Sequence, residues 1–319
     1  MKISVLVPVY GVEKYIARCA ESLFGQTYQD LEFVFVDDCT PDRSVAILQE
    51  VMARWPQRAE QVRILRNDRN RGIGYVRQRL IDECTGEGIT FVDSDDYMPS
   101  RAIELLAAEM ERSGADMVDG AWQSVTPQGV SAVRRPYKTP DGGRYLVLLL
   151  CQNVVSNRMW GRLYRRSLFT ENGIRLVPGI DFSEDYSVMA RLLFYARRAA
   201  IDAPVYFYSE ENASSYTHTA SPRHARSYLM ACRVVLDFFT RNDTAGRYLT
   251  PLQFGMANAL RNIRRAGFSL SLADQLLGYR PQGAFFRLLA AMLRGKCPLA
   301  VADFTYLLAR KIYLSVLNR

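Results

Sequence analysis

The sequence predicts an α/β protein in which a largely parallel sheet is flanked by helices and followed by a helical extension. Over the first hundred residues, short apolar runs that are typical of buried strands alternate with segments whose apolar residues recur at helical spacing. The chain has 319 residues, 49% of them hydrophobic, which is enough for a substantial core in one large domain or two. After about Ser221 the pattern is helical to the end of the sequence.

Strands are expected where apolar residues run together, and helices where they recur every three or four positions. Segment 12–24 shows the helical pattern, with apolar residues at Val12, Ile16, Cys19, Ala20 and Leu23. We expect strands at 2–9, 31–36, 62–65, 88–92, 117–125 and 205–208. We expect helices at 12–24, 44–54, 74–83, 101–113, 145–153 and 182–195. Residues 128–143 are rich in glycine, proline and basic residues and are expected to form a surface loop.

Three carboxylates stand directly after one predicted strand. Asp93-Ser94-Asp95-Asp96 follows the apolar run that ends at Val92. Carboxylates that share a small volume repel one another and raise one another's pKa, so a divalent cation that neutralises them makes such a cluster easier to tolerate. The same residues are also compatible with a solvated turn whose aspartates cap the next helix.

Two further loops should meet these carboxylates. Open α/β sheets bind ligands beyond the carboxyl ends of their parallel strands. The Asp37-Asp38 pair follows the second predicted strand, and Pro8-Val9-Tyr10 ends the first. We therefore expect three loops to line one pocket.

Composition excludes several other classes of site. The six cysteines are scattered without a C-x-x-C pair, which argues against a zinc ribbon and against a disulfide framework. Only two histidines are present, so a histidine-rich metal site is excluded and a Ser-His-Asp triad has little material. We expect no leader peptide, since Lys2 to Pro8 already has the pattern of a core strand, and no apolar run is long enough to span a bilayer. A cytoplasmic location is the expectation.

Charge is distributed unevenly along the chain. Residues 223–319 contain 15 Lys or Arg and 4 Asp or Glu, a net charge of +11, whereas the whole chain carries +8. The basic residues alternate with apolar ones, as in amphipathic helices that lie on an anionic membrane surface. The alternative is a helical subdomain whose arginines are merely solvated. Nucleic-acid binding is not expected, because no zinc finger, RNA-recognition or helix-turn-helix signature accompanies the charge.

Four motifs in fixed order resemble one known family. They are Ile3-Ser4-Val5-Leu6-Val7-Pro8-Val9-Tyr10, Val36-Asp37-Asp38-Cys39-Thr40-Pro41-Asp42, Asn70-Arg71-Gly72-Ile73-Gly74-Tyr75-Val76-Arg77 and Asp93-Ser94-Asp95-Asp96. Together they cover about residues 1–100 and resemble an inverting family-2 glycosyltransferase of the GT-A fold, of the type found in bacterial surface-polysaccharide synthesis. Later segments extend the resemblance, namely Trp160-Gly161-Arg162-Leu163-Tyr164-Arg165-Arg166 and Ser183-Glu184-Asp185-Tyr186.

The resemblance implies an architecture. It implies a Rossmann-like mixed sheet flanked by helices, forming a catalytic domain over residues 1–220. Residues 1–100 would be its nucleotide-sugar half and 101–220 its acceptor half, with 221–319 as a basic, helical C-terminal region. The oligomeric state is not indicated.

The resemblance also implies roles on the donor side. Pro8, Val9 and Tyr10 would contact the nucleoside, and the Tyr10 ring is able to stack on a base. Asp38 would accept a nucleobase N–H or a ribose hydroxyl, while Gly72 lets its loop approach the nucleotide closely and Arg77 reaches the diphosphate or the aspartates.

For the acidic cluster, the resemblance makes Asp95 the direct ligand of Mn²⁺ or Mg²⁺. Asp93 would face the ribose or the metal, Ser94 the nucleotide sugar, and Asp96 would either support the ligands or face the acceptor.

On the acceptor side the resemblance makes Asp185 the general base, with Glu184 positioning the acceptor or the base. The same pair is compatible with acids that merely compensate the dipole of a helix N-terminus. Trp160 and Arg162 belong to the matching segment, where arginine replaces the usual lysine. The segment from Tyr208 to His218 corresponds to a mobile flap of the family, to which Ser214 or Ser215 and His218 would contribute, although Ser209-Glu210-Glu211 departs from the usual arginine there.

The function implied is transfer of a sugar from a nucleotide-diphosphate donor, UDP-linked by family frequency, to a hydroxyl of a glycan or lipid-linked acceptor. A catalytically degenerate nucleotide-sugar binding or scaffold module is the alternative. A sugar nucleotidyltransferase would need a glycine-rich loop after the first strand, and a dinucleotide oxidoreductase would need G-x-G-x-x-G there. The chain has Pro-Val-Tyr-Gly instead.

Overall fold

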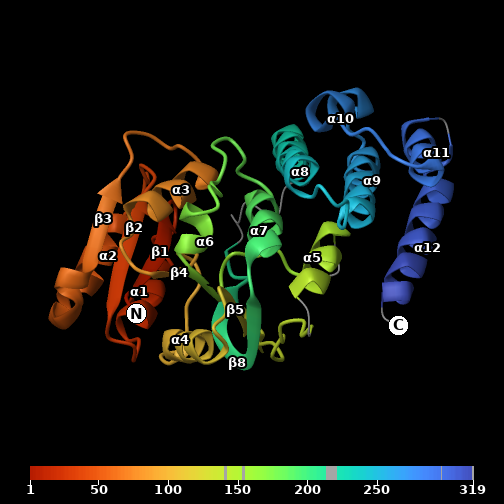
Figure 1. Cartoon of the computed structure of the whole chain (residues 1–319). Coiled ribbons are helices and arrows are strands. Elements are labelled where there is room, and N and C mark those ends of the chain that lie inside the picture. Colours follow the sequence, from red (N-terminus) through yellow and green to blue (C-terminus); the bar gives the residue numbers. More distant parts are fainter. Residues whose placement is uncertain (140–141, 153–154, 213–220, 296, 318–319) are drawn as a thin grey trace. The chain divides into compact units, whose positions relative to one another are not determined.

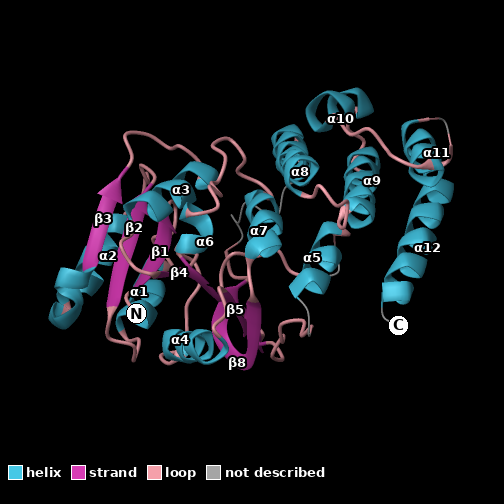
Figure 2. Ribbon diagram, viewed as in Figure 1, coloured by secondary structure: helices cyan, strands magenta, loops and turns pink. Residues whose placement is uncertain are grey.

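A computed structural model describes residues 1–139, 142–152, 155–212, 221–295 and 297–317. The chain forms two compact units. The first comprises residues 1–142, 158–181 and 195–218, and the second comprises residues 143–157, 182–194 and 219–319. The second unit therefore contains two segments that lie before residue 220, whereas the predicted domains were continuous in sequence. Figure 1 traces the chain, and Figure 2 shows its helices and strands.

The first unit is built on one mixed sheet with eight strands among the described residues. Its parallel part consists of β1 (Ile3–Val9), β2 (Leu31–Asp37), β3 (Val62–Arg66) and β4 (Gly88–Phe91), in the spatial order β3-β2-β1-β4. β7 (Arg162–Arg165) runs antiparallel between β4 and β5 (Met117–Thr126), and β8 (Arg198–Ser209) pairs in parallel with β5. The two-residue β6 (Gly129–Val130) forms a hairpin with β5.

The helices of this unit cover both faces of the parallel strands. Every residue of β2 is buried, as expected for a strand inside a parallel sheet. α1 (Ile16–Phe24), α2 (Ser44–Ala53) and α4 (Ala102–Ser113) share one core with Val5, Val7 and the other odd-numbered residues of β1. α3 (Ile73–Glu83) packs against β1 and β2 with apolar residues outside that core, so it covers the opposite face.

The second unit is helical. It contains most of α5 (Gly142–Leu150) and α7 (Glu184–Tyr195), together with α8 (Pro222–Asn242), α9 (Leu249–Arg265), α10 (Leu270–Leu277), α11 (Ala284–Arg294) and α12 (Leu299–Leu317). The Ser221 side chain accepts a hydrogen bond from the backbone N–H of His224, and Pro222 follows it, so α8 begins with a favourable cap. Among the described residues, no helix is both long enough and apolar enough to cross a bilayer.

Gln152 joins four segments inside this helical unit. Its Oε1 accepts hydrogen bonds from Tyr228 Oη of α8 at 2.7 Å and from Asn258 Nδ2 of α9 at 2.8 Å. Its backbone carbonyl accepts from Arg310 of α12 at 3.0 Å. Gln152 is buried and holds φ at +53°, which only the surrounding bonds make tolerable for a residue with a side chain. Gln152, two residues after the end of α5, is thus held by the C-terminal helices.

The predicted elements are largely confirmed. The six expected strands and six expected helices all exist, with boundaries that shift by a few residues, apart from α1 and β8. Helix α1 begins at Ile16 instead of 12, and β8 already begins at Arg198 instead of 205. Four short elements were not predicted, namely β6 inside the expected loop, β7, α6 (Ser167–Thr170) and the 3₁₀ helix η1 (Pro56–Gln61).

The short strand β7 depends on a buried ion cluster. Arg162 of β7 is fully buried and pairs with the carboxylate of Asp119 on β5. Arg198 of β8 pairs with the same carboxylate, with 2.8 Å between its Nε and Asp119 Oδ2. Burial alone would raise the pKa of Asp119, but the positive charges of Arg162, Arg198 and Arg158 hold that pKa below its ordinary value. One carboxylate therefore joins three strands.

Replacing Asp119 with alanine should destabilise the fold strongly. The change leaves two buried guanidinium groups without their counter-charge, which typically costs about 3–5 kcal/mol. Urea unfolding at neutral pH measures this loss. Because the folded pKa is lowered, the contribution of Asp119 is present above its ordinary pKa of about 3.9 and is lost as pH falls through the lower folded value. The variant should lack this part of the acid dependence.

Asp237→Ala serves as the control, since Asp237 pairs with Arg233 on the surface of α8. Its unfolding midpoint should change little, because surface ion pairs contribute little. A loss of similar small size for Asp119→Ala would contradict the role assigned to the cluster.

Candidate active site

The loops that follow the parallel strands meet at one edge of the sheet. Val9 pairs with Asp37 and Asp37 with Arg66, so β1, β2 and β3 end at the same level. The chain continues this pairing just past the strands, where Asp38 N–H donates to Val9 O at 3.0 Å and Asn67 N–H to Asp37 O at 2.8 Å. This edge is where an open α/β sheet binds its ligands, as the sequence predicts.

Asp38 organises the loop after β3. Its Oδ1 accepts hydrogen bonds from Asn67 Nδ2 at 2.6 Å and from Arg71 N at 2.8 Å, and its Oδ2 accepts from Gly72 N at 2.9 Å. A carboxylate has about four acceptor positions, so Oδ2 retains one for a ligand. The next residue, Cys39, holds φ at +60° to make this turn.

The loops after β1 and β2 are tied together. Gly11 N–H donates to Thr40 Oγ1 at 2.9 Å, and Thr40 Oγ1 donates to Asp42 Oδ1 at 2.7 Å. The same Asp42 oxygen accepts from Ser44 N, the first residue of α2, at 3.1 Å. Tyr10, beside Gly11, is 50% exposed, whereas Val9 is buried and Pro8 is partly buried. The Tyr10 ring is therefore available for stacking.

The glycine loop is packed against Asp181, a residue that the sequence analysis did not select. Gly72 has φ at +85° and ψ at 159°, a conformation that glycine alone adopts readily. A Cβ atom at Gly72 would lie 2.3 Å from Asp181 Oδ1, and one at Gly74 would lie 2.6 Å from the Ile180 carbonyl oxygen. Gly74 N–H also donates to Asp181 Oδ1 at 3.3 Å. Close packing therefore requires glycine at both positions.

In the acidic cluster, Asp93 is paired with Arg77. Arg77 Nη2 lies 2.8 Å from Asp93 Oδ1. The sequence analysis expected this arginine to reach either the diphosphate or the aspartates, and in the structure it pairs with an aspartate. Arg77 is buried and Asp93 is partly buried, so this ion pair is largely shielded from water. Ser94, which follows, is buried.

Asp95 and Asp96 are held by the end of β8 and the residues after it. Asp95 Oδ2 accepts from Asn212 Nδ2 at 2.9 Å. Asp96 Oδ2 accepts from Tyr206 Oη at 2.7 Å and its Oδ1 from Ser209 N at 2.7 Å. Both Asp96 oxygens thus already accept from the protein, which favours the supporting alternative over an acceptor-facing one.

Burial and mutual repulsion raise the pKa of two of these carboxyls. For Asp95, burial is the larger cause and the negative charge of Asp93 the next. For Asp96, burial again comes first, followed by Asp95 and Asp93, and its pKa is raised well above the ordinary value. The crowding expected from the sequence is real, and a positive charge placed beside Asp93 and Asp95 would relieve it.

The segment after β8 is anchored on α1. Arg18 of α1 pairs with Glu211 at 3.2 Å and donates to Ser209 Oγ at 3.2 Å. Tyr15 Oη donates to the carbonyl of Glu211 at 3.2 Å. Glu211, in the Ser209-Glu210-Glu211 segment that departs from the family pattern, thus has a partner in this chain. Ser214, Ser215 and His218 lie outside the described residues.

The Trp160 to Arg166 segment is built into the core of the first unit. Trp160 stacks on Tyr206, with ring centroids 4.4 Å apart, and is almost wholly buried. Arg162 is fully buried against Asp119, so its guanidinium group is engaged inside the fold. Tyr206 links Trp160 to the acidic cluster, because its hydroxyl accepts a hydrogen bond from Asp93 N–H at 3.0 Å.

Glu184 and Asp185 begin α7 in the second unit. Ser183, just before them, holds φ at +64°, so the chain turns sharply into this helix. The backbone carbonyl of Glu184 accepts from Ser187 Oγ at 2.7 Å. Their place in the first helical turn suits both predicted alternatives, a general base and compensation of the helix dipole.

Sequence reasoning missed Asn67, Asp181, Tyr206 and Asn212. Each of them forms a hydrogen bond with a predicted site residue that lies at least 29 positions away in the sequence. Tyr206 belongs to a predicted strand, but nothing in a strand pattern shows which carboxylate its hydroxyl reaches.

A family model described as "Glycosyl transferase family 2" matches residues 4–173. The chain belongs to glycosyl transferase family 2. Two relatives of this family 2 chain come from Bacillus subtilis (strain 168). One is the uncharacterized glycosyltransferase EpsJ, 30% identical over 226 residues, and the other is the putative glycosyltransferase EpsH, 29% identical over 216 residues. The matches cover 67% and 65% of this chain but only 62% and 60% of those relatives.

Solved structures confirm the predicted GT-A fold of the family 2 chain. TarS 1-349 of S. aureus, in complex with UDP-GlcNAc, has a TM-score of 0.65 and 20% identity, and the match covers 98% of this chain and 92% of that one. The mannosyltransferase PcManGT of Pyrobaculum calidifontis, in complex with GDP-Man and Mn²⁺, has a TM-score of 0.53 and 18% identity, and the match covers 96% of this chain and 87% of that one. At these identities the likeness concerns the fold.

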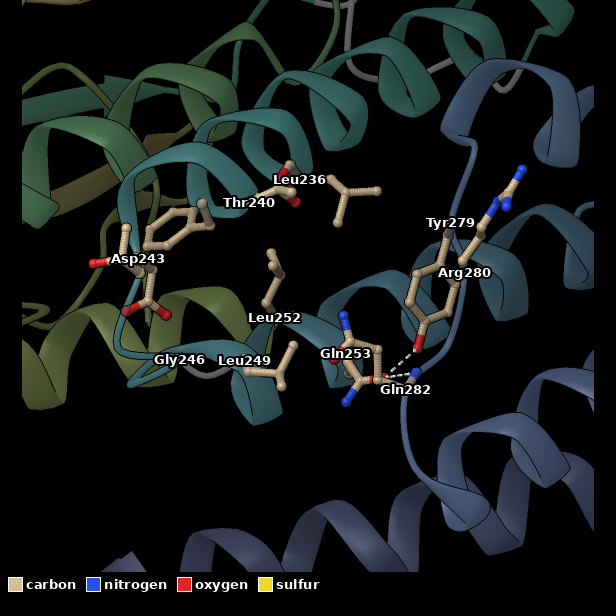
Figure 3. A pocket seen from close by; sticks show the side chains of 12 residues that line it. Leu236, Thr240, Asp243, Gly246, Leu249, Leu252, Gln253, Tyr279, Arg280 and Gln282 are labelled. Atoms are coloured by element: carbon tan, nitrogen blue, oxygen red, sulfur yellow. Dashed lines mark hydrogen bonds between the residues drawn. The ribbon is translucent and has the colours of Figure 1, made fainter.

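The second unit of the family 2 chain contains a separate pocket of about 220 Å³ (Figure 3). Gln253 Oε1 accepts from Gln282 N at 2.6 Å and from Tyr279 Oη at 3.4 Å, as the dashed lines show. Asp243 accepts from the backbone N–H groups of Arg247 and Tyr248, which fixes the turn that leads into α9. None of the predicted site residues that the structure describes lines this pocket. Its polar groups serve the fold.

Substituting Gly72 should reveal the contact with Asp181. Gly72→Ala introduces both an unfavourable backbone conformation and a Cβ that meets the Asp181 carboxylate, and strain of this kind costs about 1–3 kcal/mol before the clash is counted. Urea unfolding measures the loss. Gly179→Ala is the matched control, because Gly179 has the same φ of +85° with no heavy atom within 4 Å of its would-be Cβ.

A second substitution completes a double-mutant cycle. Asp181→Ala removes the clashing oxygens, so the Gly72→Ala change should cost less in that background than in the parent chain. Equal costs in the two backgrounds, or equal costs of Gly72→Ala and Gly179→Ala, would show that Asp181 does not limit the glycine loop.

Proposed function

We propose that this family 2 chain is an inverting glycosyltransferase that moves a sugar from a nucleotide-diphosphate donor, UDP-linked, to a hydroxyl of a glycan or lipid-linked acceptor in cell-surface polysaccharide synthesis. The observation that carries the proposal is the meeting of Tyr10, Asp38, the Gly72 loop and the Asp93–Asp95 pair at one edge of the parallel strands. Family membership supports it. Relatives named as poly(ribitol-phosphate) glucosyl- and N-acetylglucosaminyltransferases support the polysaccharide setting.

The donor's nucleoside is proposed to bind between the first three loops. The Tyr10 ring would stack on the base, and the remaining acceptor position of Asp38 Oδ2 would take a base N–H or a ribose hydroxyl. The Gly72 loop, which Asp38 holds, would approach the nucleotide with its backbone. UDP is favoured because the TarS structures with a similar fold were solved with UDP and with UDP-GlcNAc.

Asp95 and Asp93 are proposed to hold Mn²⁺ or Mg²⁺. Among the described residues no group of three or more His, Cys, Asp or Glu side chains is arranged to bind a metal. Two carboxylates nevertheless fit such a cation, because Mg²⁺ takes few protein ligands and completes its shell with phosphate oxygens and water. The raised pKa of Asp95 points the same way, since its ionised form lacks enough positive charge nearby. When bound, the cation would neutralise charge on the departing diphosphate.

The chemistry proposed is a single displacement. The acceptor oxygen forms a bond to C1 of the donor sugar from the face opposite the diphosphate, while the bond from C1 to the phosphate oxygen breaks. The nucleoside diphosphate leaves with that electron pair, and the carboxylate of Asp185 takes the proton of the acceptor hydroxyl. Glu184 is proposed to position the acceptor or the base. Arg77, paired with Asp93, would supply positive charge at the edge of the same site.

A cytoplasmic location is proposed from the cysteines. All six are free thiols, four of them buried, which suits a reducing compartment.

Titration calorimetry with UDP, GDP and dTDP tests the donor site. We expect one nucleotide, UDP, to bind in the presence of Mn²⁺ and to bind much more weakly without it or to Asp95→Ala, because the variant loses the proposed metal ligand. Asp82→Ala is the control. It removes a carboxylate of α3 that pairs with Arg175, and the variant should bind UDP as the parent does. If none of the three nucleotides binds with Mn²⁺, the degenerate scaffold is the better description.

Hydrolysis of the UDP-sugar by water, without acceptor, tests the catalytic assignment. Asp185→Asn keeps the shape of the side chain but removes the base, so the rate should fall by about 10²- to 10⁴-fold while UDP affinity is unchanged. Glu184→Gln should lower this hydrolysis rate less, because Glu184 is proposed to position the base or the acceptor and not to take the proton. A larger rate loss in Glu184→Gln than in Asp185→Asn would exchange the two roles, and full activity in both would exclude this pair.

A further inference from the structure

The outward side of α12 is apolar. Val301, Phe304, Leu308, Ile312 and Val316 recur at spacings of three and four along this helix, which places them on one stripe. All five are exposed, Phe304 by 66% and Val316 by 65%. A helix on a protein surface normally turns a polar face to water, so an apolar stripe of this length marks an interaction surface.

The opposite side of α12 is the one that packs inside the helical unit. Tyr306 and Tyr313 contact Phe254 of α9, with ring centroids 6.2 and 5.2 Å apart. Ala302 and Tyr306 are fully buried. The exposed stripe is therefore not the core-facing side of the helix. Figure 1 shows α12 at the edge of this unit, beside α11.

The adjoining helix α11 adds exposed apolar and basic residues. Phe285 is 40% exposed and Leu288 is 62% exposed, and Arg287 beside them is exposed as well. On α12, Lys311 is exposed next to Ile312. Apolar groups bordered by cations are the pattern expected where a helix lies in the headgroup region of anionic lipid.

Electrostatics distinguishes lipid from a second copy of the chain. Residues 223–319 contain 15 basic and four acidic residues, and each acid already binds a partner within the unit. Asp237 pairs with Arg233 and Asp274 with Arg294. Asp303 binds Arg261, and Asp243 accepts from the backbone N–H of Tyr248. Two such surfaces would bring like charges together and offer no acids to receive them. An anionic surface complements the same charges.

We propose that the face formed by the exposed residues of α11 and α12 binds an anionic lipid surface. α12 would lie in the plane of the headgroups, where its stripe from Val301 to Val316, about 22 Å long at 1.5 Å per residue, is immersed. Spanning is not part of the proposal, since no described helix is long and apolar enough. Arg287 and Lys311 contact lipid phosphate, and each basic residue near such a surface strengthens binding.

Flotation of the full chain with lipid vesicles tests the proposal. The parent should float with vesicles made of equal parts phosphatidylcholine and phosphatidylglycerol, and much less with phosphatidylcholine alone. Phe304→Glu combined with Ile312→Glu should weaken binding to the anionic vesicles by about tenfold or more, because two charges enter the immersed stripe. Arg287→Gln combined with Lys311→Gln should weaken it too and reduce its sensitivity to salt.

Val130→Glu is the matched control, because Val130 is 55% exposed on β6 of the first unit and should leave flotation unchanged. Far-ultraviolet circular dichroism and UDP binding by the glutamate variants show whether the chain is still folded. Equal flotation of parent and glutamate variants, or a parent that forms a dimer broken by the same glutamates, overturns the proposal. Vesicle binding needs neither donor nor acceptor, so its failure is distinguishable from a failure of the transfer reaction.

Discussion

The buried carboxylate of Asp96 joins two distant segments of the first unit at the site. Its oxygens accept from Tyr206 Oη and Ser209 N, so the turn after β4 and the end of β8 are joined by two hydrogen bonds of 2.7 Å. The pKa of Asp96 is raised by its burial, which means that this carboxyl is kept inside at an electrostatic cost. The same turn carries Asp93, which pairs with Arg77, and Asp95, which accepts from Asn212 just beyond β8.

Two of three strained backbone positions lie beside predicted site residues. Among the described residues, three that are not glycine adopt positive φ, namely Cys39, Gln152 and Ser183. Cys39 follows Asp38, and Ser183 precedes Glu184 and Asp185. Such conformations cost about 1–3 kcal/mol each and persist where neighbouring contacts compel them. Around Cys39, Asp37 accepts from Thr40 N at 2.7 Å and Asp38 holds the next loop, so the turn is fixed on both sides.

Much of this arrangement could be predicted from the sequence because its determinants are local. The apolar runs of β1, β2 and β4 define strands, and the carboxyl ends of parallel strands then bring Tyr10, Asp38 and Asp93 to one edge. β7 escaped prediction because two of its four residues are arginines, and Arg162 is buried only because Asp119, 43 positions earlier, neutralises it. Asp181 and Asn212 escaped for a related reason, since their partners lie more than 100 residues away in sequence.

The glycine and carboxylate motifs also differ in what they reveal about chemistry. Gly72 is required whether or not a nucleotide binds, because the Asp181 carboxylate already occupies the space of a side chain there. Arg162 is likewise accounted for by the ion cluster that joins β5, β7 and β8. Asp95 is different, because its hydrogen bond from Asn212 does not offset its burial beside Asp93. Burial and the charge of Asp93 raise the pKa of Asp95, which is why we propose Asp95, and neither Gly72 nor Arg162, as a ligand of the cation.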